Sequence, residues 1–184
     1  MRHFNLLKKE HAILVVVDVQ EKFRQHIAQF EQMVKNIVRL IEACKILEIP
    51  VIVTEQYPKG LGATVLEIHR AVEGKSTFEK TAFSCCGSDE FTESLRIAGR
   101  NQIMVCGIEA HVCVNQTVHD LLARNYSVHI VEDAISSRDL NNKDVALRKM
   151  LHSGAIPSCT EMALLELVED ANAPSFKGVQ TLIR

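Results

Sequence analysis

The sequence lacks the features that would assign it to a nucleic-acid-binding, membrane or secreted class. Its 21 Lys and Arg residues stand against 23 Asp and Glu, for a formal net charge of -2, so we expect no basic surface for nucleic acid or anionic membranes. The longest apolar run, Ala12–Val17, is far short of the roughly 20 residues that a transmembrane helix needs. The opening segment MRHFNLLKKEH has no long apolar stretch and no small-residue cleavage site, so we expect a cytoplasmic protein.

Paired cysteine motifs are also missing. The chain has 6 cysteines but no Cys-x-x-Cys pair, and several of the cysteines lie in apolar runs. This pattern favours reduced thiols over disulfides, and it gives no sign of a metal site or of another cofactor. The cysteines are Cys44, Cys85, Cys86, Cys106, Cys113 and Cys159.

The composition is that of an ordinary globular protein. Hydrophobic residues make up 47% of the chain and charged residues 24%. The 184 residues match the size of one hydrophobic core, and no repeat, low-complexity segment or linker interrupts them. We therefore expect a single domain over residues 1–184.

Strand and helix patterns alternate along the chain. Ala12–Asp18 (AILVVVD) is a continuous β-branched run, typical of a strand buried on both faces, and Phe30–Leu47 has apolar residues at helical spacing. Further strands are predicted near Phe78 and at Val51–Thr54, Ile103–Gly107, Val128–Glu132 and Ala155–Ser158. Further helices are predicted at Ser88–Ala98, Ala110–Arg124, Asn141–Ser153 and Glu161–Asp170, with weaker helical character in the tail from Ala173.

This alternation predicts an α/β fold with a doubly wound, mainly parallel six-stranded sheet. Helices should cover both faces, as in a Rossmann-like three-layer sandwich. The segment Gln56–Thr77 shows no regular pattern, and we expect it to form a long functional loop.

Two charged residues lie where predicted strands end, which is where ligands bind in open parallel sheets. Asp18 is either a turn or helix-capping residue or a general base beside a nucleophile. Lys80 follows the short strand near Phe78. By itself it would be a solvated surface lysine, but next to a carboxylate and a thiol it would stabilise negative charge.

Cys113 lies in the first turn of the predicted helix Ala110–Arg124. An α-helix would place it about 100° from the apolar stripe that begins at Val114, and therefore off the packing face. The helix N-terminus favours an anion, which predicts a lowered thiol pKa and backbone amides free to bind an oxyanion. The alternative is a small buried hydrophobic residue, a role that also fits Cys106 in the preceding strand.

These three residues, in this order, lie in segments that resemble the isochorismatase-like cysteine hydrolases. The segments are LVVVDVQ with Asp18, FEKTAFS with Lys80 and CGIEAHVCV with Cys113, and the resemblance runs over nearly the whole chain. It implies that Cys113 is the nucleophile, that Asp18 takes its proton, and that Lys80 holds the pair and stabilises charge. It also implies a homo-oligomer.

The resemblance further implies a non-proline cis peptide between Ile108 and Glu109. This bond would turn the Glu109 amide inward, so that the amides of Glu109 and Cys113 form an oxyanion hole. Such bonds cost about 3–4 kcal/mol and persist only where their surroundings enforce them.

Departures from the family pattern reduce the number of activities that the resemblance implies. Nicotinamidase-like members carry an Asp-x-His-x-x-His metal site, which the loop TEQYPKGLGATVLEIH lacks, so no metal is expected. Isochorismatases proper lack the nucleophilic cysteine, and the amidases of the family have Thr or Ala where this chain has Glu109. TEQYPKGLG and GIEAHVCV are most similar to the isochorismatase domain-containing branch.

We therefore expect a hydrolase that cleaves a C–N amide-type bond of a small molecule through a thioacyl intermediate on Cys113. The predicted substrate-binding residues are Gln20, Phe23, Tyr57 and Leu61.

Two alternatives stay open. One is a non-catalytic assembly or regulatory protein, because Glu109 puts a negative charge near the expected oxyanion. The other is thiol redox sensing by Cys113, with Cys85 or Cys86 as the resolving partner.

Overall fold

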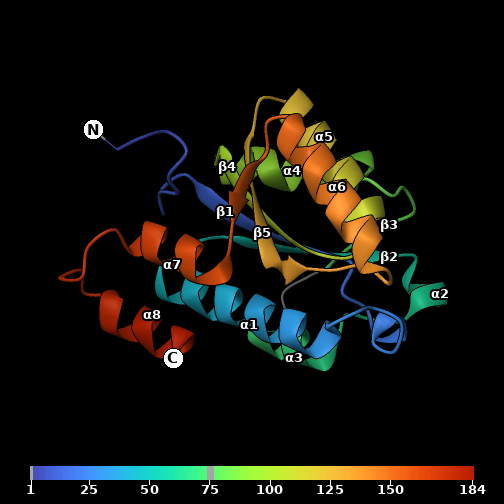
Figure 1. The fold of residues 1–184 in the computed structure, drawn as a ribbon, viewed down its shortest axis with the longest axis horizontal. Coiled ribbons are helices and arrows are strands. Elements are labelled where there is room, and N and C mark those ends of the chain that lie inside the picture. Colours follow the sequence, from blue (N-terminus) through green and yellow to red (C-terminus); the bar gives the residue numbers. More distant parts are fainter. Residues whose placement is uncertain (1, 74–76) are drawn as a thin grey trace.

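A six-stranded sheet forms the centre of the computed structural model, which describes residues 2–73 and 77–184 (Figure 1). The strand order is β3-β2-β1-β4-β5-β6, and every neighbouring pair is parallel. The strands are β1 (Ala12–Val17), β2 (Val51–Gln56), β3 (Phe78–Lys80), β4 (Gln102–Gly107), β5 (Ser127–Ile135) and β6 (Ile156–Ser158). The predicted doubly wound α/β fold is confirmed, and the order reverses between β1 and β4, where such sheets bind ligands.

The strand β1 shows why this sheet is covered on both faces. Its six residues are all buried, and successive side chains point to opposite faces of the sheet. Ala12, Leu14 and Val16 belong to one apolar cluster. Ile13, Val15 and Val17 belong to the other cluster. A strand without polar alternation therefore needs a helical layer on each side.

The helices form those two layers (Figure 1). One face carries α1 (Phe30–Ile46), α3 (Leu66–Ala71), α7 (Thr160–Val168) and α8 (Phe176–Ile183). The other face carries α4 (Asp89–Ala98), α5 (Asn115–Ala123) and α6 (Leu140–His152). No helix within the described ranges is long and apolar enough to cross a membrane.

The segment Gln56–Thr77 is more regular than predicted. The strand β2 extends through Gln56, and two short helices follow, α2 (Pro58–Leu61) and α3. Residues 74–76 of this predicted loop lie outside the described residues.

The predicted helix Ala110–Arg124 is wrong in its first turn. Ala110–Val114 is π-helical, with the Val114 amide donating to the Glu109 carbonyl at 3.2 Å, and the α-helix begins only at Asn115. A π-turn closes over one more residue than an α-turn, so the angular spacing used to place Cys113 does not apply. Ser88 caps α4, since its side chain accepts from the Phe91 amide at 3.4 Å.

Candidate active site

Asp18 directly follows β1 and is 1% exposed. It adopts a left-handed backbone conformation with φ of 53°, which is uncommon for a residue with a side chain and often marks a functional position. Thr54 of β2 pairs with Val17 in the sheet, so its hydroxyl reaches the Asp18 Oδ1 atom at 2.8 Å. Parallel pairing thus brings two polar residues together at one edge of the sheet.

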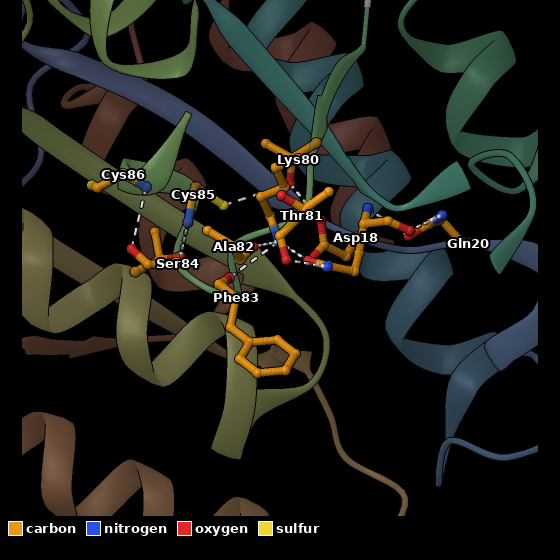
Figure 2. A network of polar contacts seen from close by, with 12 residues as sticks. Asp18, Gln20, Lys80, Thr81, Ala82, Phe83, Ser84, Cys85 and Cys86 are labelled. Carbon is orange, nitrogen blue, oxygen red and sulfur yellow. Dashed lines mark hydrogen bonds and ion pairs between the residues drawn. The ribbon is translucent and has the colours of Figure 1, made fainter. Parts of the chain in front are cut away.

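Lys80 ends β3 and reaches the same carboxylate. Its Nζ atom lies 2.6 Å from Asp18 Oδ2, and each side chain is 2% exposed. Nζ also donates to Gln56 Oε1 at 2.7 Å. The carbonyls of Ala82 and Phe83 fold around the ammonium at 3.2 and 3.1 Å (Figure 2). A buried ion pair persists when further hydrogen bonds satisfy both partners, as they do here. Lys80 is therefore not a solvated surface residue.

The chain after β4 passes very close to β1. Gly107 has φ of 110°, and a Cβ atom there would lie 2.2 Å from the Val17 carbonyl oxygen. Only glycine allows this approach, after which the Ile108 amide donates to the same carbonyl at 2.8 Å. The next peptide bond, Ile108–Glu109, is cis.

Cys113 is 7% exposed and packs within an apolar cluster, so the prediction that it lies off the packing face is wrong. Its thiol pKa is raised, chiefly by burial and then by the negative charge of Asp18, while Lys80 acts in the opposite direction. The predicted lowering of this pKa is also wrong, because loss of solvation and a nearby carboxylate outweigh the favourable end of the helix. At neutral pH the thiol is therefore protonated.

Asp18 and Cys113 line one cavity of about 290 Å³. Its polar lining residues are Asp18, Gln56, Glu109, Cys113 and Arg138. Two of the predicted substrate-binding residues, Phe23 and Leu61, also lie in its wall.

The other two predicted substrate-binding residues are placed differently. Gln20 is fully buried, and its side chain donates to the carbonyls of Gln56 and Gly62 at 3.0 and 2.6 Å. It therefore ties β2 to the loop after α2 instead of facing the cavity. Tyr57 is 54% exposed and lines a second pocket with Lys59 and Ser88.

Glu109 forms a close ion pair with Arg138. The Arg138 Nη2 atom lies 2.6 Å from Glu109 Oε1, Nε lies 3.1 Å from Oε2, and the Arg138 amide donates to Oε2 at 3.0 Å. Burial disfavours the charged form of Glu109, but these bonds prevail and hold its pKa below the usual value. The carboxylate near the cavity is thus ionised and paired with a cation.

Sequence reasoning missed Thr54, Gln56 and Arg138. Thr54 and Gln56 belong to the polar end of β2, which follows its three apolar residues, and polar residues at a strand end were an available signal. Arg138 lies beyond β5 in an irregular segment, and nothing local marks it as the partner of Glu109. Across residues 2–73 and 77–184, no group of three or more His, Cys, Asp or Glu side chains is placed to hold a metal ion.

The two cysteines expected as resolving partners, Cys85 and Cys86, are both buried. Burial raises the pKa of Cys85 to about 11, and its sulfur lies 3.6 Å from the Thr54 hydroxyl. Burial also raises the pKa of Cys86. Both are protonated at neutral pH, which makes them slow thiol nucleophiles.

The parallel sheet and the polar cluster at the carboxyl ends of its strands define a doubly wound α/β protein with a candidate ligand site where the strand order reverses, between β1 and β4. Residues 12–162 match the isochorismatase domain family. The chain is 46% identical over 178 residues to isochorismatase domain-containing protein 2 of Danio rerio, covering 96% of this chain and 89% of that protein. It is 43% identical over 173 residues to the Homo sapiens protein of that name, covering 94% and 83%.

Solved structures show the same architecture. The MAR1 ribonuclease from Caenorhabditis elegans superposes with a TM-score of 0.90 at 42% identity, covering 97% of this chain and 92% of that one. The Escherichia coli YcaC gene product, described as an octameric hydrolase of unknown specificity, has a TM-score of 0.92 at 20% identity, covering 100% and 91%, which shows a likeness of fold. The chain belongs to the isochorismatase domain family of hydrolases.

Proposed function

We propose that this protein is a cysteine hydrolase that cleaves a C–N amide-type bond of a small molecule through a thioacyl intermediate on Cys113. The observation that carries the proposal is the Asp18–Lys80 ion pair. Its charged atoms lie 2.6 Å apart between side chains that are 2% exposed, and Asp18 shares a cavity with Cys113. A buried carboxylate and a thiol that line one cavity are typical of catalytic sites.

In the first half-reaction, Asp18 takes the thiol proton as the Cys113 sulfur bonds to the substrate carbonyl carbon. The raised pKa of the thiol makes this transfer simultaneous with attack rather than prior to it. The resulting oxyanion would accept from the backbone amides of Glu109 and Cys113. The Glu109 amide donates to no backbone carbonyl among the described residues, so it is available for this role.

Asp18 then returns its proton to the substrate nitrogen. The C–N bond breaks, the amine leaves, and the acyl group stays on sulfur as a thioester. In the second half-reaction Asp18 takes a proton from water, the hydroxide adds to the thioester carbonyl, and the C–S bond breaks. The thiolate regains the proton, so the net reaction consumes one water and gives an acid and an amine.

Lys80 acts as a positioning residue in this scheme. Its ammonium holds Asp18 Oδ2 while the Thr54 hydroxyl holds Oδ1. These two contacts fix the orientation of the carboxylate, as a general base requires.

RNA cleavage is a second candidate, because the C. elegans relative is named a ribonuclease. A cavity of about 290 Å³ with one ion-paired arginine suits a small acyl group better than a phosphodiester chain, which proteins bind on basic surfaces. The non-catalytic alternative is a third possibility and predicts no chemistry at Cys113.

An acyl-trapping experiment separates these candidates. The protein is incubated with a panel of small amides, quenched in acid, and measured by intact mass and peptide mapping. We expect an acyl adduct on Cys113 and release of amine, both absent in Cys113→Ala. The matched control is Cys159→Ala, a partly exposed cysteine at the start of α7, which should keep the adduct.

A parallel incubation uses single-stranded RNA. Absence of adduct and of amine release across the panel refutes the amidase proposal, and RNA shortening that depends on Cys113 would favour the ribonuclease instead.

Three broader expectations stay predictions. They are a single domain over residues 1–184, a cytoplasmic location and a homo-oligomeric state. The octameric YcaC gene product, which shares the fold, supports the last of these.

A further inference from the structure

Most of the exposed surface inside the cavity beside Cys113 is apolar. The apolar lining residues are Phe23, Leu61, Phe83, Ile108 and Val112. Phe83 is 54% exposed, lines this cavity, and points away from the Lys80 network (Figure 2). Apolar walls of this kind bind hydrocarbon, while a few polar groups orient the reacting atoms.

Every charged side chain in the cavity wall already has a partner of opposite sign. Asp18 is paired with Lys80 at 2.6 Å, and Glu109 is paired with Arg138 at 2.6 Å. The Glu109–Arg138 pair has several contacts, because Arg138 donates from its side chain and from its backbone amide to the two carboxylate oxygens of Glu109. The cavity therefore presents no free charge to a ligand.

A charged substrate would have to break one of these pairs. A carboxylate would compete with Glu109 for Arg138, and Glu109, whose residue is 5% exposed, would lose its cation. A substrate cation would compete with Arg138 for Glu109. An uncharged substrate disturbs neither pair.

We propose that the Glu109 side chain determines substrate charge: it holds Arg138 and so restricts the cavity to uncharged amides with a small apolar acyl group. The inference rests on the proposed amidase function for its reaction. The charge preference itself is a property of binding and is measurable without turnover.

The test measures binding to the Cys113→Ala protein, in which no acyl transfer occurs. Three amides of similar length serve as probes: pentanamide (neutral), succinamate (anionic) and 4-aminobutanamide (cationic). Titrations followed by NMR give their dissociation constants. We expect pentanamide to bind at least about 10-fold more tightly than either charged amide, since charged hydrogen bonds are worth that much or more.

Glu109→Gln in the same background releases Arg138 while keeping the shape of the side chain. We expect succinamate binding to improve at least about 10-fold and pentanamide binding to change by less than about 3-fold. Adding Arg138→Met to that variant should remove the gain. Glu161→Gln, an exposed glutamate of α7, is the matched control and should leave all three constants unchanged.

Arg138→Met alone gives an independent check, because the Arg138 side chain is 64% exposed and its replacement removes little packing. It leaves Glu109 without its cation, so 4-aminobutanamide should bind at least about 10-fold more tightly than before.

Equal binding of the three amides while Glu109 is present, no binding of any amide, or unchanged preferences in both variants would overturn the inference. A selective cavity in a protein that never forms the acyl adduct would instead contradict the proposed function alone.

Discussion

Replacing Asp18 with Asn should make Cys113 react faster with iodoacetamide while abolishing turnover of any amide substrate. The two effects go in opposite directions because Asp18 has two roles. Its negative charge helps to raise the thiol pKa, and its carboxylate is the base that removes the thiol proton during attack. Asn keeps the size of the side chain and can still accept from Thr54, so the ion pair is the main interaction lost.

The size of the effect follows from electrostatics. Two unit charges about 4 Å apart interact by about 4 kcal/mol at an effective dielectric constant of about 20. The Asp18 carboxylate and a Cys113 thiolate are both largely buried, so screening by water is weak. Even one third of that repulsion changes the thiolate fraction about tenfold at fixed pH below the thiol pKa. The charge of Lys80, no longer balanced by Asp18, acts in the same direction.

The assay follows alkylation of Cys113 by peptide mass mapping between about pH 6 and 9, a range in which ordinary thiols begin to ionise. We expect the rate profile of the variant to shift to lower pH, with at least about a tenfold faster rate at neutral pH. Asp144→Asn, an exposed acid of α6, is the control and should leave the profile unchanged. If Cys113 in a folded Asp18→Asn protein reacted no faster than in the wild type, the electrostatic account of this site would be refuted.

Two further predictions concern stability. Gly107→Ala puts a Cβ atom 2.2 Å from the Val17 carbonyl oxygen at φ of 110°, and should lower the free energy of unfolding in urea by about 3 kcal/mol or more. Gly99→Ala at φ of 62°, with no atom within 4 Å, should cost only about 1–2 kcal/mol, and similar losses in the two variants would contradict the close contact. Burial lowers the pKa of His129 from 6.5 to about 4. As the pH falls from 6.5 to about 4, His129 of the unfolded chain therefore binds a proton that the folded protein excludes. The free energy of unfolding should decrease by about 3 kcal/mol over this pH range. An equal decrease in His129→Gln would show that another group is responsible.

The fold was predictable because its signals are local. The apolar run of β1 and the helical spacing in α1 are properties of short segments, and they gave the correct elements to within a few residues. The same reasoning failed for the first turn of the helix at Cys113. The local sequence at Ala110–Val114 is compatible with either a π-turn or an α-turn, and tertiary contacts decide which of the two forms.

The site was predictable only in part. The ends of predicted strands and the start of a predicted helix made Asp18, Lys80 and Cys113 candidates, and the family resemblance assigned them their roles. The structure brings Asp18 and Lys80 into contact across 62 residues of chain. The Glu109–Arg138 pair, which spans 29 residues, had no counterpart in the sequence reasoning, and without it the charge of Glu109 looked like an obstacle to catalysis.

By itself, the sequence determined the succession of strands and helices along the chain and the candidate site residues at the strand ends. Both depend on hydrophobic periodicity, which is a property of neighbouring residues. The tertiary structure alone decided which charges pair, how deeply the sulfur of Cys113 is buried and in which direction its pKa moves. Solvation and Coulomb interactions depend on distances through space, and a linear pattern does not contain those distances.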